Sequence, residues 1–231
     1  MRKKLVWWLT ICSLITTVFF LASPLVTNAR ATTYHELENL VNKATKTFYD
    51  FMADPDMGWV RSNLKKAKAI LIIPASYKGG FIFGAEGGTG VLLARDEKTG
   101  KWSYPAFYTM GSVSFGLQIG GKVSEIILLI MTERGKAALL SPSFKLGADI
   151  SVAAGPVGAG AEAKTFDVLA FARSKGVFGG ISVSGAVITA RGSMNEIYYG
   201  KKVRPVDILY LHAVSNKQAD KLIAAVSKYG S

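Results

Sequence analysis

The sequence predicts an α+β fold: a curled antiparallel sheet of about eight to ten strands, barrel-like or a sandwich, with an N-terminal amphipathic helix and C-terminal helices. Three observations lead to this prediction. Residues 69–131 alternate short apolar runs with glycine, which is typical of strands and unfavourable for a helix. Residues 33–52 and 216–228, which flank the glycine-rich region, carry apolar side chains at helical spacing.

Composition indicates a single basic domain. The chain has 231 residues, of which 49% are hydrophobic and 19% charged, enough apolar material for one sizeable core. Its formal net charge is +12, which favours an anionic partner such as a membrane surface, a nucleic acid or an acidic polymer. We expect one domain over residues 30–231, because no repeat or long linker divides the chain.

Residues 1–29 have the pattern of a secretory signal peptide. A charged start (residues 2–4) precedes an apolar run (residues 5–21), and small residues at Thr27, Ala29 and Ala31 allow cleavage after either alanine. An uncleaved membrane anchor is the alternative, since the apolar run approaches the roughly 20 residues that span a bilayer.

Cysteine usage agrees with an exported domain without disulfides. The one cysteine, Cys12, lies inside the apolar run of residues 5–21, so a cleaved chain would have none. Stability must then come from packing. Cleavage would remove three positive charges and no negative ones, so the remaining domain stays basic.

The first helix is expected over residues 33–52. Thr33 and Glu36 have the spacing of a capping box. Two interpretations stand: the apolar face packs on the sheet, or it inserts into lipid as an amphipathic helix. The apolar face consists of Leu37, Leu40, Val41, Ala44, Phe48 and Phe51.

The strands are expected where β-branched and aromatic residues cluster, and the glycines between them mark turns, bulges or close backbone approach. Residues 126–130 are continuously apolar, so their strand should be buried on both faces. Residues 95–103 should form a hairpin with a polar tip. The expected strands are residues 69–73, 81–83, 90–96, 101–103, 112–119, 123–131, 146–154, 168–172 and 177–188; shorter helices are expected over 59–68, 132–140, 194–199, 204–207 and 216–228.

Five stretches of the chain resemble the SYLF domain family, a lipid-binding domain of fungal and animal actin-patch adaptors, plant proteins and secreted bacterial proteins. The resemblance covers most of the chain after about residue 34 and implies binding of anionic phospholipid, phosphoinositides included. The stretches are AKAILIIPASYKGGFIFGAEGGTGVLLARD (67–96), WSYPAFYTMGSVSFGLQIG (102–120), SEIILLIMTERG (124–135), FKLGADISVAAGPVG (144–158) and ARSKGVFGGISVSGAVI (172–188).

Two groups of cations are the candidate lipid-binding residues. The denser group has four cations on the expected helix at residues 59–68, and each cation held near an anionic membrane adds about 1 kcal/mol. An ordinary solvated helix face is the alternative. The first group is Arg61, Lys65, Lys66 and Lys68 together with Lys78; the second is Lys201, Lys202 and Arg204.

No catalytic, metal or cofactor site can be assembled from the sequence. His35 and His212 are more consistent with structural or exposed positions than with a catalytic base. Glu86, Glu125 and Glu162 fall in or near expected strands and could meet in space, which is the one hydrolase-like arrangement available. The glycine clusters match no phosphate-loop motif.

Three functions follow from these observations. The first is a non-enzymatic lipid-binding module that is exported to the periplasm or the cell exterior and associates with membrane. The second is a structural or partner-binding envelope protein, suggested by the actin-regulating adaptors of the family. The third is a hydrolase. Nucleic acid is not expected, because the chain has an export signal and no recognisable binding motif.

Overall fold

The computed structural model describes residues 32–80, 83–115, 120–154, 166–174, 177–178 and 183–230. The signal peptide or anchor predicted for residues 1–29 lies outside these residues. None of the helices in the described ranges is long and apolar enough to cross a bilayer.

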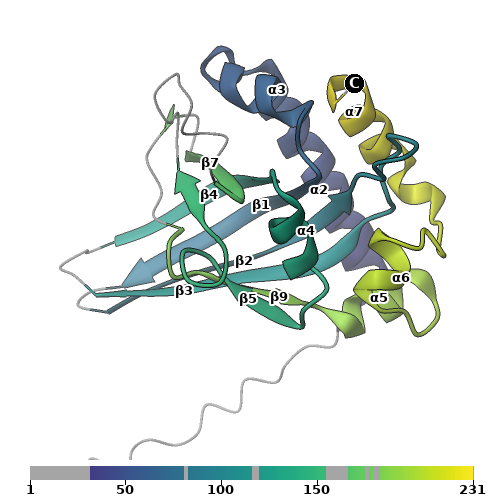
Figure 1. Cartoon of the computed structure of the whole chain (residues 1–231). Coiled ribbons are helices and arrows are strands. Elements are labelled where there is room, and N and C mark those ends of the chain that lie inside the picture. Colours follow the sequence, from purple (N-terminus) through teal and green to yellow (C-terminus); the bar gives the residue numbers. More distant parts are fainter. Residues whose placement is uncertain are drawn as a thin grey trace, which may run out of the picture. The chain divides into compact units, whose positions relative to one another are not determined.

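The predicted α+β class is confirmed: helices pack around one curled, half-barrel sheet, which has nine strands in the described part of the chain (Figure 1). The strand order is β5-β9-β3-β2-β1-β4-β7-β6, with β8 paired to β7. All pairs are antiparallel except β6 with β7, which is parallel and departs from the expected all-antiparallel sheet. The strands are β1 (Ala69–Gly80), β2 (Phe83–Ala94), β3 (Ala106–Phe115), β4 (Gly120–Ile130), β5 (Ser143–Lys145), β6 (Val152–Ala154), β7 (Val168–Ser174), β8 (Val177–Phe178) and β9 (Val187–Ala190).

The four central strands are longer than expected, because each continues past glycines at which the sequence pattern suggested that a strand would end. A Cβ on Gly90 would lie 2.2 Å from the carbonyl oxygen of Ile72, and one on Gly88 would lie 2.4 Å from that of Ala75. Both contacts fall at the β-bulge where the β1–β2 register shifts after Ile72. These two glycines therefore permit close backbone approach at a bulge inside a strand, which is one of the roles expected for them from the sequence, and they do not end the strand.

Other expected strands are shorter or broken. Residues 101–103 form only an isolated bridge, between Arg95 and Trp102, although the predicted hairpin is present. The expected strand over 146–154 is interrupted by a turn, in which Gly147 has a φ of +81°. Residues 177–188 divide into β8 and the start of β9, with 179–182 outside the described residues.

Two apolar clusters cover the two faces of the sheet. One contains side chains of α2 (Tyr34–Ala53), α3 (Gly58–Leu64) and α7 (Asp220–Gly230), and the other contains side chains of α6 (Pro205–Leu209) and of the segments around β5 and β9. Residues 126–130 of β4 alternate between the two clusters. Their predicted burial on both faces is confirmed, since none is more than 2% exposed.

Helix α2 forms where the sequence pattern placed it. The Thr33 hydroxyl accepts a hydrogen bond from the Glu36 amide, and the Glu36 carboxylate accepts one from the Thr33 amide, so the capping box is present. The apolar side chains of the helix pack on the sheet, and Phe48 and Phe51 are fully buried. Burial of one such side chain contributes roughly 1.5–3 kcal/mol. The packed interpretation is therefore confirmed, and most of the apolar face is already covered.

The shorter helices largely follow the prediction. The helix expected over 59–68 ends at Leu64, and Gly230 lies in the final helix and not beyond it. Asn216 caps the 3-10 turn that leads into α7. The remaining helical elements are η1 (Pro55–Met57), α4 (Glu133–Ala138), α5 (Gly192–Tyr199) and η3 (Lys217–Ala219).

Candidate functional site

Lys65 and Lys66 lie on the exposed turn that links α3 to β1. In the described ranges neither ammonium group takes part in an ion pair. Arg95, at the end of β2, joins them: its guanidinium donates to the Lys65 carbonyl oxygen at 2.9 Å and lies 6.0 Å from the ring centroid of Trp102. A hollow of about 360 Å³ lies beside this group, lined by Lys66, Ala67, Lys68, Arg95, Asp96, Glu97 and Gly100. We call Lys65, Lys66 and Arg95 the basic corner.

Lys68 borders the same hollow, but its charge is locally neutralised. Its ammonium contacts the carboxylates of Glu133 and Glu97, the latter at 2.6 Å. The hydrogen bonds that the ammonium donates to Glu133 and Glu97 raise the pKa of Lys68. Lys68 therefore remains protonated and serves mainly to join β1 to the hairpin of residues 95–103 and to α4.

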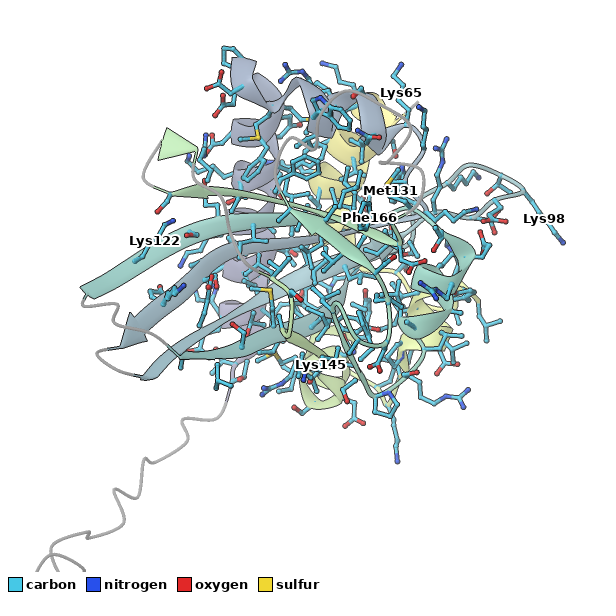
Figure 2. All side chains as sticks on the ribbon, turned by 60° about the vertical axis from the view of Figure 1, so that its left-hand side comes forward. Lys65, Lys98, Lys122, Met131, Lys145 and Phe166 are labelled. Atoms are coloured by element: carbon cyan, nitrogen blue, oxygen red, sulfur yellow. The ribbon has the colours of Figure 1, made fainter. Side chains whose placement is uncertain are left out.

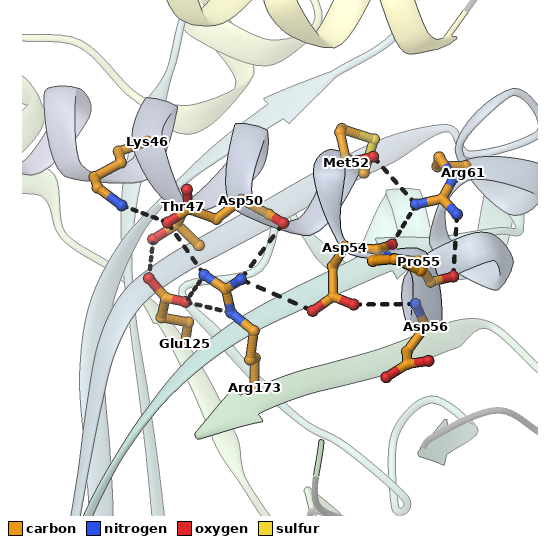
Figure 3. Close-up of polar contacts among 10 residues, drawn as sticks. All are labelled: Lys46, Thr47, Asp50, Met52, Asp54, Pro55, Asp56, Arg61, Glu125 and Arg173. Carbon is orange, nitrogen blue, oxygen red and sulfur yellow. Dashed lines mark hydrogen bonds and ion pairs between the residues drawn. The ribbon is translucent and has the colours of Figure 1, made fainter. Parts of the chain in front are cut away.

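Arg61 belongs to α3, and its guanidinium is used within the fold (Figure 3). It donates to the carbonyl oxygens of Met52 at 3.1 Å, Asp54 at 2.6 Å and Pro55 at 3.3 Å. These carbonyls end α2 and begin the next turn, so Arg61 satisfies backbone acceptors that the helix leaves without partners.

The structure separates Lys78 from the other cations of its predicted group. Lys78 lies ten residues beyond Lys68 along β1, which corresponds to roughly 33 Å of extended chain. Its register partner on β4 is Lys122, and Figure 2 shows Lys122 and Lys65 on opposite sides of the molecule. Lys78 therefore belongs to the far end of the sheet and does not join the other cations with which the sequence grouped it.

The second predicted group also lies apart from the basic corner. Lys201, Lys202 and Arg204 occupy the connection between α5 and α6, which Figure 1 shows at the bottom right, whereas α3 is at the top. Arg204 pairs with Asp207 at 3.1 Å, and that hydrogen bond raises the pKa of the Arg204 guanidinium. Lys202 is exposed.

Arg95 is the member of the basic corner that the sequence interpretation did not select. The sequence pattern places Arg95 only in the expected hairpin over residues 95–103. The pairing of Arg95 with Trp102 follows from that hairpin and could have indicated a cation held by an aromatic ring. Its proximity to Lys65 could not have been found, because the two residues are 30 positions apart in the chain.

A network around Arg173 holds α2 against the sheet (Figure 3). The Arg173 guanidinium binds Glu125 of the adjacent strand at 2.6 Å and Asp50 of α2 at 3.1 Å. Thr47 donates to the other oxygen of Glu125 at 2.9 Å. Burial acts to raise the pKa of Asp50, but Lys46 and Arg173 outweigh it and the pKa is lowered. The network is a structural clamp with its charges mutually paired.

The carboxylates considered for catalysis do not converge. Glu86 accepts a hydrogen bond from Ser76 at 3.1 Å on one face of the sheet, whereas Glu125 binds Thr47 and Arg173 on the face that carries α2. Glu162 lies outside the described residues. The described residues contain no group of three or more His, Cys, Asp or Glu that could hold a metal ion.

Comparison with known proteins gives one family. A family model described as "Ysc84: Las17-binding protein actin regulator" matches residues 111–229. This confirms the resemblance drawn from the sequence stretches, since the matched range includes the last three of them.

Three similar proteins carry related names. The SH3 domain-containing YSC84-like protein 1 of Homo sapiens is 28% identical over 204 residues, which cover 84% of this chain and 59% of that protein. Protein YSC84 of Saccharomyces cerevisiae is 34% identical over 145 residues, 59% of this chain and 31% of that protein. The LAS seventeen-binding protein 3 of the same yeast is 35% identical over 145 residues, 59% of this chain and 31% of that protein. The chain thus spans about three fifths of the first relative and about one third of the yeast proteins.

Proposed function

This chain belongs to the Ysc84 family of Las17-binding actin regulators, and from that membership we propose that it is a non-enzymatic module that binds anionic phospholipid, phosphoinositides included. The net charge of +12 supports an anionic partner. The separation of Glu86 from Glu125 removes the arrangement on which a hydrolase would depend, which favours binding over catalysis.

The observation that carries the proposal is the basic corner. Lys65 and Lys66 present exposed ammonium groups that make no ion pair in the described part of the chain, and Arg95 adds a third cation beside them. At about 1 kcal/mol per cation near an anionic membrane, these three residues would supply roughly 3 kcal/mol. The hollow beside them offers room for a phosphate group.

The proposed location is outside the cytoplasm, in the periplasm or the cell exterior, on a membrane surface. The signal-peptide pattern of residues 1–29 supports export. The test is fractionation of cells that produce the chain, with N-terminal sequencing of the recovered protein. Recovery from the cytoplasm with residue 1 intact would overturn this part of the proposal.

Binding of a protein partner is the second candidate function. It is favoured by the description of the family, which names Las17 binding, and by the name of one yeast relative, the LAS seventeen-binding protein 3. In this alternative the chain is a structural or adaptor protein of the envelope. Chemical crosslinking of the chain in its native compartment would recover one stable protein partner, while anionic liposomes would recover no chain.

Liposome sedimentation tests the lipid proposal. Lys65→Glu with Lys66→Glu should weaken binding to anionic liposomes about 30-fold or more, because roughly 2 kcal/mol of attraction is lost and repulsion is added. Binding by the unaltered chain should also fall as salt is raised toward about 1 M, where charges are screened within about 3 Å.

Lys201→Glu with Lys202→Glu is the matched control, because it changes the net charge by the same amount at the distant second group. It should retain most of the binding. Equal losses in the two variants would show that overall charge, and not the basic corner, drives binding. Failure of the unaltered chain to sediment with any anionic headgroup would overturn lipid binding itself.

A further inference from the structure

A groove lies between the N-terminal half of α2 and the far ends of the central strands. It holds about 590 Å³ and is lined by residues that include Leu40, Lys43, Tyr77, Gly87 and Gly111. A second hollow of about 380 Å³ shares Leu40 and Lys43 and continues along α2. Both volumes lie within the roughly 300–1,000 Å³ of small-molecule sites.

Two glycines, Gly87 and Gly111, form the floor of the groove at positions where the fold has room for a larger side chain. Gly87 and Gly111 are register partners on β2 and β3. A Cβ on Gly111 would meet no heavy atom within 4 Å, and one on Gly87 would meet only the Met110 carbonyl oxygen at 3.4 Å. Neither glycine has a positive φ. Neither backbone geometry nor packing therefore explains them, whereas Gly88 and Gly90 on the opposite face are needed at the bulge.

The lining of the groove matches an amphiphile with one negative charge. Lys43 is the one charged residue lining the larger hollow, it is exposed, and it makes no ion pair with any described residue. Leu40 and Tyr77 provide apolar walls, and Tyr77 is 65% exposed. Beyond the groove, on the same face, Val113 is 82% exposed, which extends the apolar surface along the sheet.

We propose that this groove holds one acyl chain of an anionic phospholipid drawn from the membrane, with the acyl chain lying over Gly87 and Gly111 and the phosphate beside Lys43. The inference rests on the proposed function for its ligand class, but it uses residues separate from the basic corner. The basic corner would attract the membrane surface, and the groove would hold a single lipid.

The test uses the full chain and oleoyl lysophosphatidic acid below its micelle concentration, measured by displacement of a fluorescent fatty acid. Gly87→Val with Gly111→Val fills the groove and should weaken binding at least tenfold. Ser112→Val is the matched control, because it adds a side chain of similar size on the same strand but toward the opposite face. It should bind as the unaltered chain does.

Lys43→Gln tests the headgroup position. It should weaken binding of lysophosphatidic acid several-fold and leave binding of the uncharged oleoyl monoglyceride unchanged. Equal affinity of the glycine variant and the unaltered chain, or no binding by the unaltered chain, would overturn the proposal. A dimer of the unaltered chain that Gly111→Val converts to monomer would also overturn it, since a second copy would then be the occupant.

A measurement on the unaltered chain covers the case in which the glycine variant does not fold. A lysophosphatidic acid with a photoactivatable group near the end of its acyl chain should label peptides containing Leu40 or Tyr77. Labelling confined to other peptides would contradict the groove. Lys65→Glu with Lys66→Glu separates the two proposals: it should reduce liposome sedimentation but preserve binding of monomeric lysophosphatidic acid.

Discussion

Asp167 joins three separate segments through one nearly buried carboxylate. Its oxygens accept hydrogen bonds from Thr132 at 2.5 Å and from the hydroxyl of Ser151 at 2.7 Å, and they also bind the Arg134 guanidinium. Burial alone would raise the pKa of Asp167, but these donors outweigh it and hold the pKa well below its usual range. A single side chain therefore fixes α4, β7 and the start of β6 relative to one another.

Asp167→Asn should lower the free energy of unfolding by about 1.5–3 kcal/mol near neutral pH, because charge-assisted hydrogen bonds are lost. Since the folded pKa is lowered, the stabilising contribution is complete above the unfolded pKa of about 3.9 and is lost as pH falls toward the folded value. The difference from the unaltered chain should shrink on acidification below about pH 4. Urea unfolding at several pH values checks this, and a constant difference would contradict the role of the carboxylate charge.

The sequence shows which residues are basic, but it does not show which of them form ion pairs with carboxylates in the fold. Lys68 and Lys66 look alike in the chain, yet Lys68 contacts Glu97 and Glu133 while the ammonium of Lys66 pairs with no described residue. Those partners lie on a hairpin and a helix that only the tertiary fold brings to the start of β1. A cluster read from sequence spacing therefore overestimates the charge that is free to meet a ligand.

At the scale of elements, the glycines at the bulge between β1 and β2 let both strands continue past the register shift. The register shifts between Ile72 and Tyr77, and a Cβ on Gly88 or Gly90 of β2 would overlap a carbonyl oxygen of β1. Helix α2 was predictable because its periodicity and cap are local. The strand lengths were not, because a glycine that ends a strand and one that permits close approach inside a strand look the same in the sequence.

Gly90→Ala should destabilise the fold by about 1–3 kcal/mol or more, because its Cβ would overlap the Ile72 carbonyl oxygen and force the strands apart. Gly111→Ala is the control on the adjacent strand, where the space is open. It should leave stability unchanged or raise it by about 0.4–1 kcal/mol by restricting the unfolded chain. Thermal unfolding of both variants checks the contrast, and similar losses would contradict this account of the bulge.

The clamp between α2 and the sheet gives a second prediction at this scale. Arg173→Leu should cost about 2–3 kcal/mol, since it leaves the partly buried carboxylate of Glu125 without its cation and that of Asp50 with only the exposed Lys46. Lys46→Ala removes only an exposed partner of Asp50 and should cost about 0.5 kcal/mol or less. Hydrogen exchange should show faster opening of α2 in the Arg173 variant alone. Unchanged exchange would mean that apolar packing by itself holds the helix.

For the whole molecule, the distribution of charge restricts the orientations in which the protein can dock on a flat membrane. The basic corner follows α3, which is at the top of the view in Figure 1, whereas the second group lies between α5 and α6, at the lower right. The sequence indicated a basic domain, but it could not show that its two cation groups lie in different parts of the fold. One docked orientation can therefore use one group fully and leave the other in water.

Single-cysteine probes would establish that orientation. In a Cys12→Ser background, an environment-sensitive dye at Lys98→Cys, on the hairpin beside the basic corner, should shift its emission to the blue on addition of anionic liposomes. The same dye at Lys202→Cys should not respond, because that side would face water. Equal shifts at the two positions would mean that the molecule binds in several orientations, and a shift at position 202 alone would assign the membrane contact to the second group. Each substitution removes one lysine, so the two variants have the same net charge. A difference between their dye responses therefore reports the orientation of the protein on the membrane and not the strength of the overall electrostatic attraction.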